Sequence, residues 1–117
     1  MITLPVKEPW YSMILSGEKR EKYVEIKEFY RSRFASQFPT IEKKSQLDEW
    51  LLTPISYMLD VRLRNGYSAS SPSFVAHCRL KIGKGRKEWG AEEGKTYYIL
   101  EIPERQNADN KTAEEKG

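Results

Sequence analysis

The sequence predicts one small α+β domain, built as a β-barrel or as a curved, mostly antiparallel sheet with two to three helices. Three observations support this prediction. The chain of 117 residues is long enough for one hydrophobic core but too short for two ordinary domains, which need on the order of 100 residues each. Apolar residues alternate along several short segments, as in strands with one buried face. Helical spacings fall in the first half of the chain, before the longest alternating runs.

The first elements follow in order from the N-terminus. Residues 2–4 predict a short strand, and residues 9–16 then show the spacing of one helical face. Gly17 is suited to end that helix, because glycine adopts left-handed dihedral angles freely. A second strand is predicted over residues 19–26, and a second helix around residues 28–34.

The middle of the chain has a looser pattern. Between residues 35 and 54 only Leu47, Trp50 and Leu51 show helical spacing, so we expect one short helix there, with Ser45 as its candidate cap. We therefore expect a third, short helix before the main strands begin.

Three strands are predicted in the second half. Residues 57–64 alternate strictly and end on Asn65 and Gly66, a strong turn signal. A second alternating strand follows, in which we expect one face to point inward: Phe74, Ala76, Cys78, Leu80 and Ile82. Gly83 and Gly85 close it. The last strand spans residues 95–102, with Tyr98, Leu100 and Ile102 inward.

Beyond Pro103 apolar residues almost disappear. A segment with so few apolar residues cannot offset the entropy lost on ordering. We therefore assign residues 1–103 to the domain and expect residues 104–117 to be a disordered tail.

Composition also excludes several classes of protein. No apolar run approaches the roughly 18–20 residues that span a bilayer, so we expect no membrane partner. The N-terminus lacks a secretory pattern, and one cysteine permits no intramolecular disulfide, so we expect a cytoplasmic protein. With one histidine and one cysteine, we expect neither a metal nor another cofactor.

The net charge is only +3, but the cations are clustered. Between residues 62 and 87 there are seven cations and no acidic residue: Arg62, Arg64, Arg79, Lys81, Lys84, Arg86 and Lys87. If the two alternating strands are neighbours, five basic side chains share a face, with Asn65 and Tyr67 at its edge: Arg62, Arg64, His77, Arg79 and Lys81. Cations beside an aromatic ring suit a phosphate backbone and a stacked base. The alternative is an ordinary solvated sheet face.

Two further features are candidates for chemistry. Residues 17–25 alternate basic and acidic side chains between a helix end and a strand, a junction that presents a lysine beside a carboxylate. The alternative is a set of exposed, mutually paired charges. Trp89 follows the Gly-rich turn, where an exposed indole could stack on a base, although packing is the simpler role of a large aromatic residue.

Three segments resemble a known family. Residues 9–19 resemble the opening of ASCH domains, in which a helix runs into a Gly-x-Lys-x-x-Glu-x-Arg signature. Residues 64–67 and 83–91 resemble a small bacterial and phage-associated branch of that family. Gly17 and Lys19 match the signature, whereas its Glu falls on Lys22 and its Arg on Val24. Together the matches span most of residues 1–102.

The resemblance implies a PUA-like small β-barrel, with the signature lining a cleft and with RNA or nucleotides as the usual ligands. Some relatives are amidohydrolases acting on an acetylated cytidine, and others are ribonucleases. In the amidohydrolases the signature lysine works with a threonine shortly after it and with a glutamate from a later strand. Here Lys22 stands three residues after Lys19, and a lysine does not replace that hydroxyl.

Three functions remain open. The leading expectation is an RNA- or nucleotide-binding module whose basic cleft uses ten residues: Lys19, Arg20, Lys22, Arg62, Arg64, Asn65, Tyr67, Arg79, Lys81 and Trp89. The alternative is a small hydrolase acting on a modified nucleoside or on RNA, with Lys19 as the activated amine and Glu21 or Glu25 as acid or base. The third is an adaptor that docks an acidic protein on the basic strands.

Overall fold

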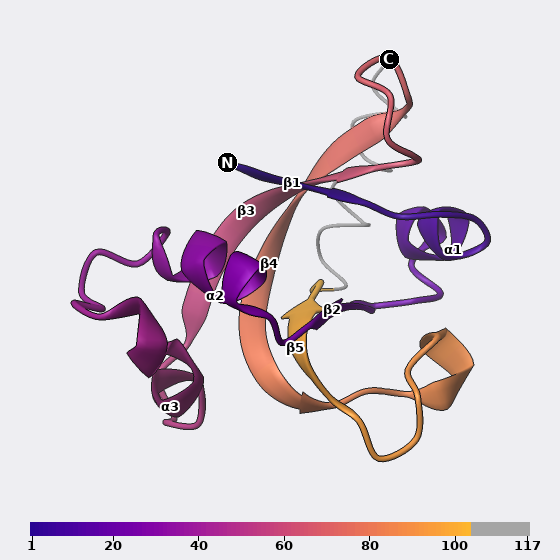
Figure 1. The fold of residues 1–117 in the computed structure, drawn as a ribbon. Helices are drawn as coiled ribbons and strands as arrows, with labels where there is room; N and C mark the ends of the chain where they lie inside the picture. Colours follow the sequence, from indigo (N-terminus) through magenta and orange to yellow (C-terminus); the bar gives the residue numbers. More distant parts are fainter. Residues whose placement is uncertain (104–117) are drawn as a thin grey trace.

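The computed structural model describes residues 1–103, and within them a five-stranded sheet curls into a half-barrel (Figure 1). The strands are β1 (Ile2–Pro5), β2 (Glu21–Glu25), β3 (Tyr57–Arg64), β4 (Ser73–Lys84) and β5 (Thr96–Glu101). Their order across the sheet is β1-β3-β4-β5-β2. β1 pairs in parallel with β3, and the remaining pairs are antiparallel. The predicted α+β class with a curved, mostly antiparallel sheet is therefore confirmed.

The helices are α1 (Trp10–Ser16), α2 (Glu28–Ala35) and α3 (Leu47–Leu51), with short 3-10 turns η1 (Lys44–Gln46) and η2 (Lys87–Trp89). Gly17 ends α1 at φ 90°, as predicted. The proposed cap at Ser45 is wrong. Ser45 lies inside η1, and the chain enters α3 directly from that turn, so no extended cap position exists.

The core fills the concave side of the sheet. The inward faces predicted for the strands are confirmed, because their alternating apolar side chains join one cluster with Phe34, Leu47 and the other buried helix residues. Tyr97 and Ile99 were not predicted to be buried, yet they lie on the opposite face of β5 at 6% and 4% exposure. They pack with Ala91 and Tyr23, since the connection from β4 to β5 covers that face.

One prediction about β4 needs correction. Gly83 does not close the strand but lies inside it, paired with Tyr97 of β5. β4 is 12 residues long and bends around the barrel, and in Figure 1 it is the longest arrow. Without a side chain at Gly83, the strand continues past the point where its sequence signals a turn.

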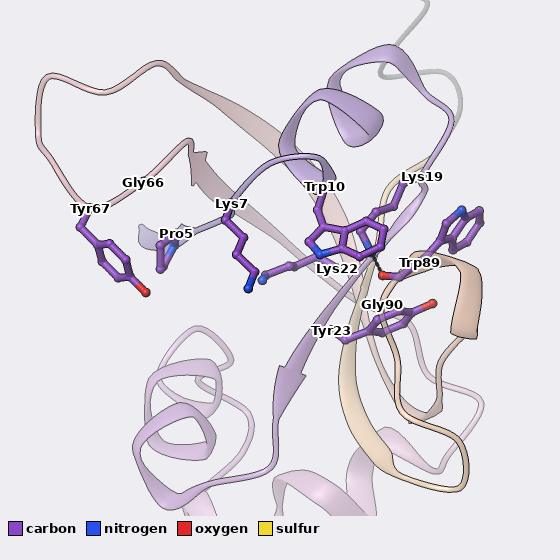
Figure 2. Close-up of a pocket in the computed structure, with 10 residues that line it drawn as sticks. All are labelled: Pro5, Lys7, Trp10, Lys19, Lys22, Tyr23, Gly66, Tyr67, Trp89 and Gly90. Carbon is purple, nitrogen blue, oxygen red and sulfur yellow. Dashed lines mark hydrogen bonds between the residues drawn. The ribbon is translucent and has the colours of Figure 1, made fainter.

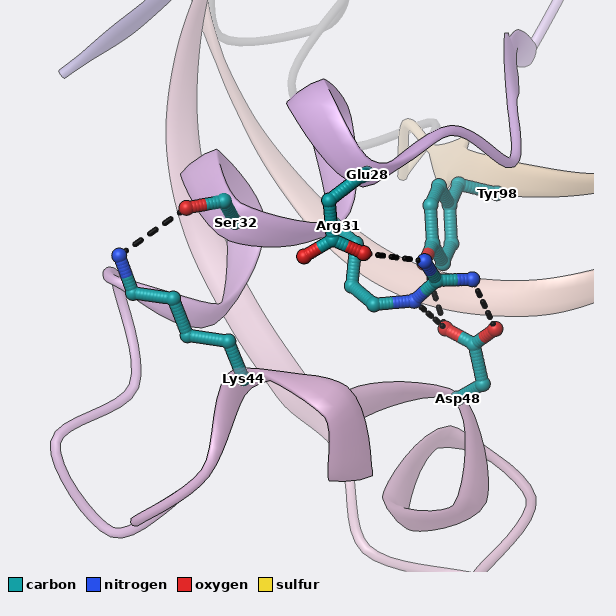
Figure 3. Close-up of polar contacts among 6 residues, drawn as sticks. All are labelled: Glu28, Arg31, Ser32, Lys44, Asp48 and Tyr98. Carbon is teal, nitrogen blue, oxygen red and sulfur yellow. Dashed lines mark hydrogen bonds and ion pairs between the residues drawn. The ribbon is translucent and has the colours of Figure 1, made fainter.

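A polar cluster fixes the helices to the sheet (Figure 3). Arg31 of α2 donates two hydrogen bonds to Asp48 of α3, at 2.9 Å and 3.3 Å, and Tyr98 of β5 donates a third at 2.5 Å. Burial alone would raise the pKa of Asp48, but these hydrogen bonds outweigh it and hold that pKa below its ordinary value. The cluster therefore joins α2, α3 and β5 through one carboxylate.

The two outermost strands in the sheet order are β1 and β2, so they border the open side of the half-barrel. α1 connects them and lies beside that open side (Figure 1). This arrangement brings Pro5, Lys22 and Tyr67 together in one region. The predicted tail, residues 104–117, lies outside the described residues.

Candidate functional site

A cleft of about 360 Å³ opens between the edges of β1 and β2 (Figure 2). Its wall is formed by three lysines, four aromatic residues, one proline and two glycines. These are Lys7, Lys19 and Lys22; Trp10, Tyr23, Tyr67 and Trp89; and Pro5, Gly66 and Gly90. A volume near 360 Å³ lies at the lower end of the range of roughly 300–1,000 Å³ that holds small ligands.

Lys19 forms the deepest charged point of the cleft. It is 3% exposed, and its Nζ donates a hydrogen bond of 2.6 Å to the carbonyl oxygen of Trp89. The same ammonium lies 5.2 Å from the ring centroid of Trp10 and 4.6 Å from that of Tyr23. Two aromatic faces and one carbonyl thus stabilise a cation that has almost no contact with water.

The backbone places Lys19 there through the end of α1. Gly17 turns the chain back, and the Lys19 N–H donates a hydrogen bond of 2.9 Å to the Met13 carbonyl. On the opposite wall Gly90 has a φ of +97°, and a Cβ there would lie 3.1 Å from the Trp10 ring. Glycine at position 90 therefore allows both the turn of the Trp89 carbonyl toward Lys19 and the close approach of Trp10.

Tyr23 is held in place by a second glycine and two hydrogen bonds. A Cβ at Gly85 would lie 2.5 Å from the Tyr23 ring, so only glycine leaves room for it. The Tyr23 hydroxyl accepts from the Arg86 N–H at 2.8 Å and donates to Glu21 Oε1 at 2.6 Å. Burial raises the pKa of Tyr23; the hydrogen bond from the Arg86 N–H partly opposes this, and the bond to Glu21 adds to it, so the ring stays neutral beside Lys19.

The cleft is electrostatically positive. Burial, and after it the neighbouring charge of Lys22, lower the pKa of Lys19 to about 8, although Glu21 partly opposes the shift. Burial and then the charge of Lys7 lower the pKa of Lys22. Among the described residues, no carboxylate forms an ion pair with any of the three lysines. The site therefore holds positive charge that an anionic ligand would neutralise.

Four of the ten predicted binding residues line this cleft: Lys19, Lys22, Tyr67 and Trp89. Tyr67 is 88% exposed and stands on the loop at one end of the cleft, as Figure 2 shows. Trp89 presents its carbonyl to Lys19, while its indole contacts the Arg86 guanidinium at 4.8 Å. In Figure 2 that indole points away from Lys7 and Lys22.

Most of the basic strip lies elsewhere. Arg79 and Lys81 project from the outer face of β4, where Lys81 forms an ion pair with Glu101 at 3.1 Å and Arg79 approaches the same carboxylate at 3.9 Å. Arg62 donates a hydrogen bond to Ser73, and none of these three lines the cleft. The predicted basic face of β3 and β4 exists, but its cations meet a carboxylate, Glu101, that lies outside the sequence run 62–87.

The remaining predicted binding residues also lie outside the cleft wall. The Asn65 side chain donates a hydrogen bond of 3.0 Å to Glu8 Oε2, which joins the Tyr67 loop to the start of α1. Arg64 pairs with Pro5 in the sheet, and Arg20 lines a separate hollow of about 340 Å³. Asn65 therefore positions the wall of the cleft.

The two predicted acid–base residues do not line the cleft and have other partners. Glu21 lines the separate hollow with Arg20 and accepts the Tyr23 hydrogen bond. Glu25 forms ion pairs with Lys27 at 3.3 Å and Lys95 at 3.8 Å. No described carboxylate hydrogen-bonds to Lys19.

Lys7, Trp10 and Tyr23 belong to the site but were not predicted as part of it. Trp10 and Tyr23 have the spacing of core residues, and Lys7 follows a short strand with no motif around it. The available signal was Gly85 and Gly90, because glycines without a recognised motif often mark a close approach of other atoms.

Within residues 1–103, no group of three His, Cys, Asp or Glu side chains is placed to hold a metal ion. No helix in that part of the chain is long and apolar enough to cross a membrane. Comparisons with protein-family models, curated proteins and solved structures found no match to the chain. The resemblance to ASCH domains therefore stays a prediction.

Proposed function

We propose that the chain binds single-stranded RNA or a nucleotide in the cleft between β1 and β2. The observation that carries this proposal is the convergence of Lys7, Lys19 and Lys22 on one cleft without an ion-pair partner among the described residues. Phosphate oxygens are suitable partners for lysine ammonium groups, and a buried cation gains most from such a partner.

The aromatic residues support the same ligand. Tyr67 is exposed beside the lysines, and the Trp10 ring forms part of the wall. Base stacking on such rings is worth about 1–3 kcal/mol per base and does not depend strongly on sequence. The match of Gly17 and Lys19 to the ASCH signature supports an RNA or nucleotide ligand in this cleft.

Binding ranks above hydrolysis. An enzyme that uses Lys19 as an activated amine needs an acid or base within about 2.6–3.2 Å of the reacting groups. Glu21 and Glu25 are both engaged with other partners, and neither lines the cleft. The lowered pKa of Lys19 follows from burial and from Lys22, which an anion-binding site explains without catalysis.

The test is fluorescence anisotropy with a labelled single-stranded RNA at several salt concentrations. If three lysines each contact a phosphate, a plot of the logarithm of the binding constant against the logarithm of the salt concentration should have a slope of about −2. Lys22→Met should weaken binding and reduce the magnitude of this slope by about 0.7. Lys81→Met on the outer face is the matched control and should leave both unchanged. Loss of binding with Lys81→Met, but not with Lys22→Met, would overturn the assignment to the cleft.

A further inference from the structure

A second hollow adjoins the cleft along the same gap in the half-barrel. It has a volume of about 240 Å³ and shares four lining residues with the cleft: Pro5, Lys22, Tyr23 and Tyr67. Because they share a wall, the two hollows form one groove that follows the edges of β1 and β2.

Each half of the groove has its own cation and its own aromatic residue. The first half contains Lys19 with Trp10, and the second contains Lys27 with Tyr30. Lys27 stands at the start of α2, and its only carboxylate partner among the described residues is Glu25, which lies 3.3 Å away and lines the same hollow. The pattern of one ring and one cation is thus repeated along the groove.

The boundary between the halves is also suited to a nucleic acid. Lys22 and Tyr67 line both hollows, and the Lys22 side chain has no hydrogen-bond or ion-pair partner within residues 1–103. In a single strand, a phosphodiester lies between each pair of successive bases. A strand placed along the groove would bring that phosphate to Lys22 and leave a base on each side.

We propose that the groove takes two consecutive nucleotides of a single strand, so that the preferred ligand is an oligonucleotide and not a mononucleotide. This inference rests on the proposed function. The first nucleotide lies in the Lys19 half, the linking phosphate lies at Lys22, and the second nucleotide lies against Lys27 and Tyr30. The separate repetition of cation and ring in the second hollow distinguishes this arrangement from a pocket for one nucleotide.

The test compares calorimetric titrations of uridine monophosphate, the dinucleotide pUpU and a polyglutamate peptide. We expect pUpU to bind at least about fivefold more tightly than the monophosphate, because one stacked base contributes roughly 5–150-fold. Polyglutamate should not bind, since it offers charge without a base to stack.

Two variants assign the second position. Lys27→Ala should reduce the preference for pUpU and leave the affinity for the monophosphate unchanged. Lys95→Ala is the matched control, because Lys95 also forms an ion pair with Glu25, at 3.8 Å, but lines neither hollow. It should retain the full preference.

The outcomes separate the two proposals. Equal affinity for the monophosphate and pUpU, or equal loss of both with Lys27→Ala, would overturn the two-nucleotide groove and leave the proposed function standing. Failure of both nucleotides to bind would overturn the proposed function and this inference with it. Binding of polyglutamate alone would assign the groove to an acidic protein instead.

Discussion

Replacing Lys19 by methionine tests whether the cleft holds a buried cation that has no ion-pair partner among the described residues. Methionine keeps an unbranched apolar side chain but has no ionisable group. The pKa of Lys19 is about 8 in the folded chain against 10.5 for a free lysine. Between these two values the unfolded chain binds a proton that the folded chain lacks, so the free energy of unfolding should rise with pH in this window.

The expected magnitude follows from the size of the shift. One pH unit is worth up to about 1.4 kcal/mol, so the interval from about 8 to 10.5 amounts to about 3 kcal/mol. Below about pH 8 both states carry the proton, and Lys19 contributes no slope. At neutral pH the cation's contacts with Trp10, Tyr23 and the Trp89 carbonyl offset part of its desolvation.

The assay is urea denaturation of the original chain and of Lys19→Met at a series of pH values. At each pH, the variant's free energy of unfolding is subtracted from that of the original chain, which removes the contribution of all other titrating groups. The difference should be flat below about pH 8 and should rise by about 3 kcal/mol by pH 10.5. Lys27→Met, at a side chain that is 62% exposed, is the control for removing a lysine from the surface. A difference that stays constant through the window would refute the buried-charge account of the cleft.

Three further substitutions test the supports of the site and fold. Gly85→Ala places a Cβ 2.5 Å from the Tyr23 ring, so we expect a loss of about 1–3 kcal/mol in chemical denaturation; unchanged stability would contradict the contact. Asn65→Ala removes the hydrogen bond to Glu8, which joins the Tyr67 loop to α1. We expect weaker RNA binding in anisotropy measurements and little change in melting temperature. Unchanged affinity would mean that the Tyr67 loop does not need this hydrogen bond. Asp48→Asn replaces the carboxylate that accepts from both Arg31 and Tyr98 with a neutral amide, and it should cost about 1–3 kcal/mol of stability. Glu28→Gln, at the 75% exposed partner of Arg31, should cost under about 0.5 kcal/mol.

The strands of the fold were predictable because their apolar residues alternate. In residues 57–64 every second side chain is buried, and the same period continues in the middle of β4. In β5 the residues from Tyr97 to Leu100 are buried on both faces, so alternation identifies only its inner face. The strand boundaries were less predictable. Gly83 reads as a turn, but pairing with Tyr97 keeps it in β4, and this long-range contact leaves no local signal.

The candidate site was predictable only where the residues lie close together in sequence. Lys19 and Lys22 follow the glycine that ends α1, so their proximity is local. Arg79 and Lys81 share a sign of charge with them but project from the outer face, beside Glu101, which lies 20 residues beyond Lys81. The sheet register decides which cations meet carboxylates, and one-dimensional charge patterns do not contain that register.

The most direct test of the cleft as the binding site is a ¹H–¹⁵N NMR titration of the chain with a short single-stranded RNA. The account predicts that the largest chemical-shift changes occur at the backbone amides of Lys7, Lys22 and Tyr67 and at the Trp10 indole N–H, which line the cleft. The amides of Arg79 and Lys81 on the outer face of β4 should change little. Changes confined to that outer face would contradict the account, because the paired basic strip would then be the binding surface.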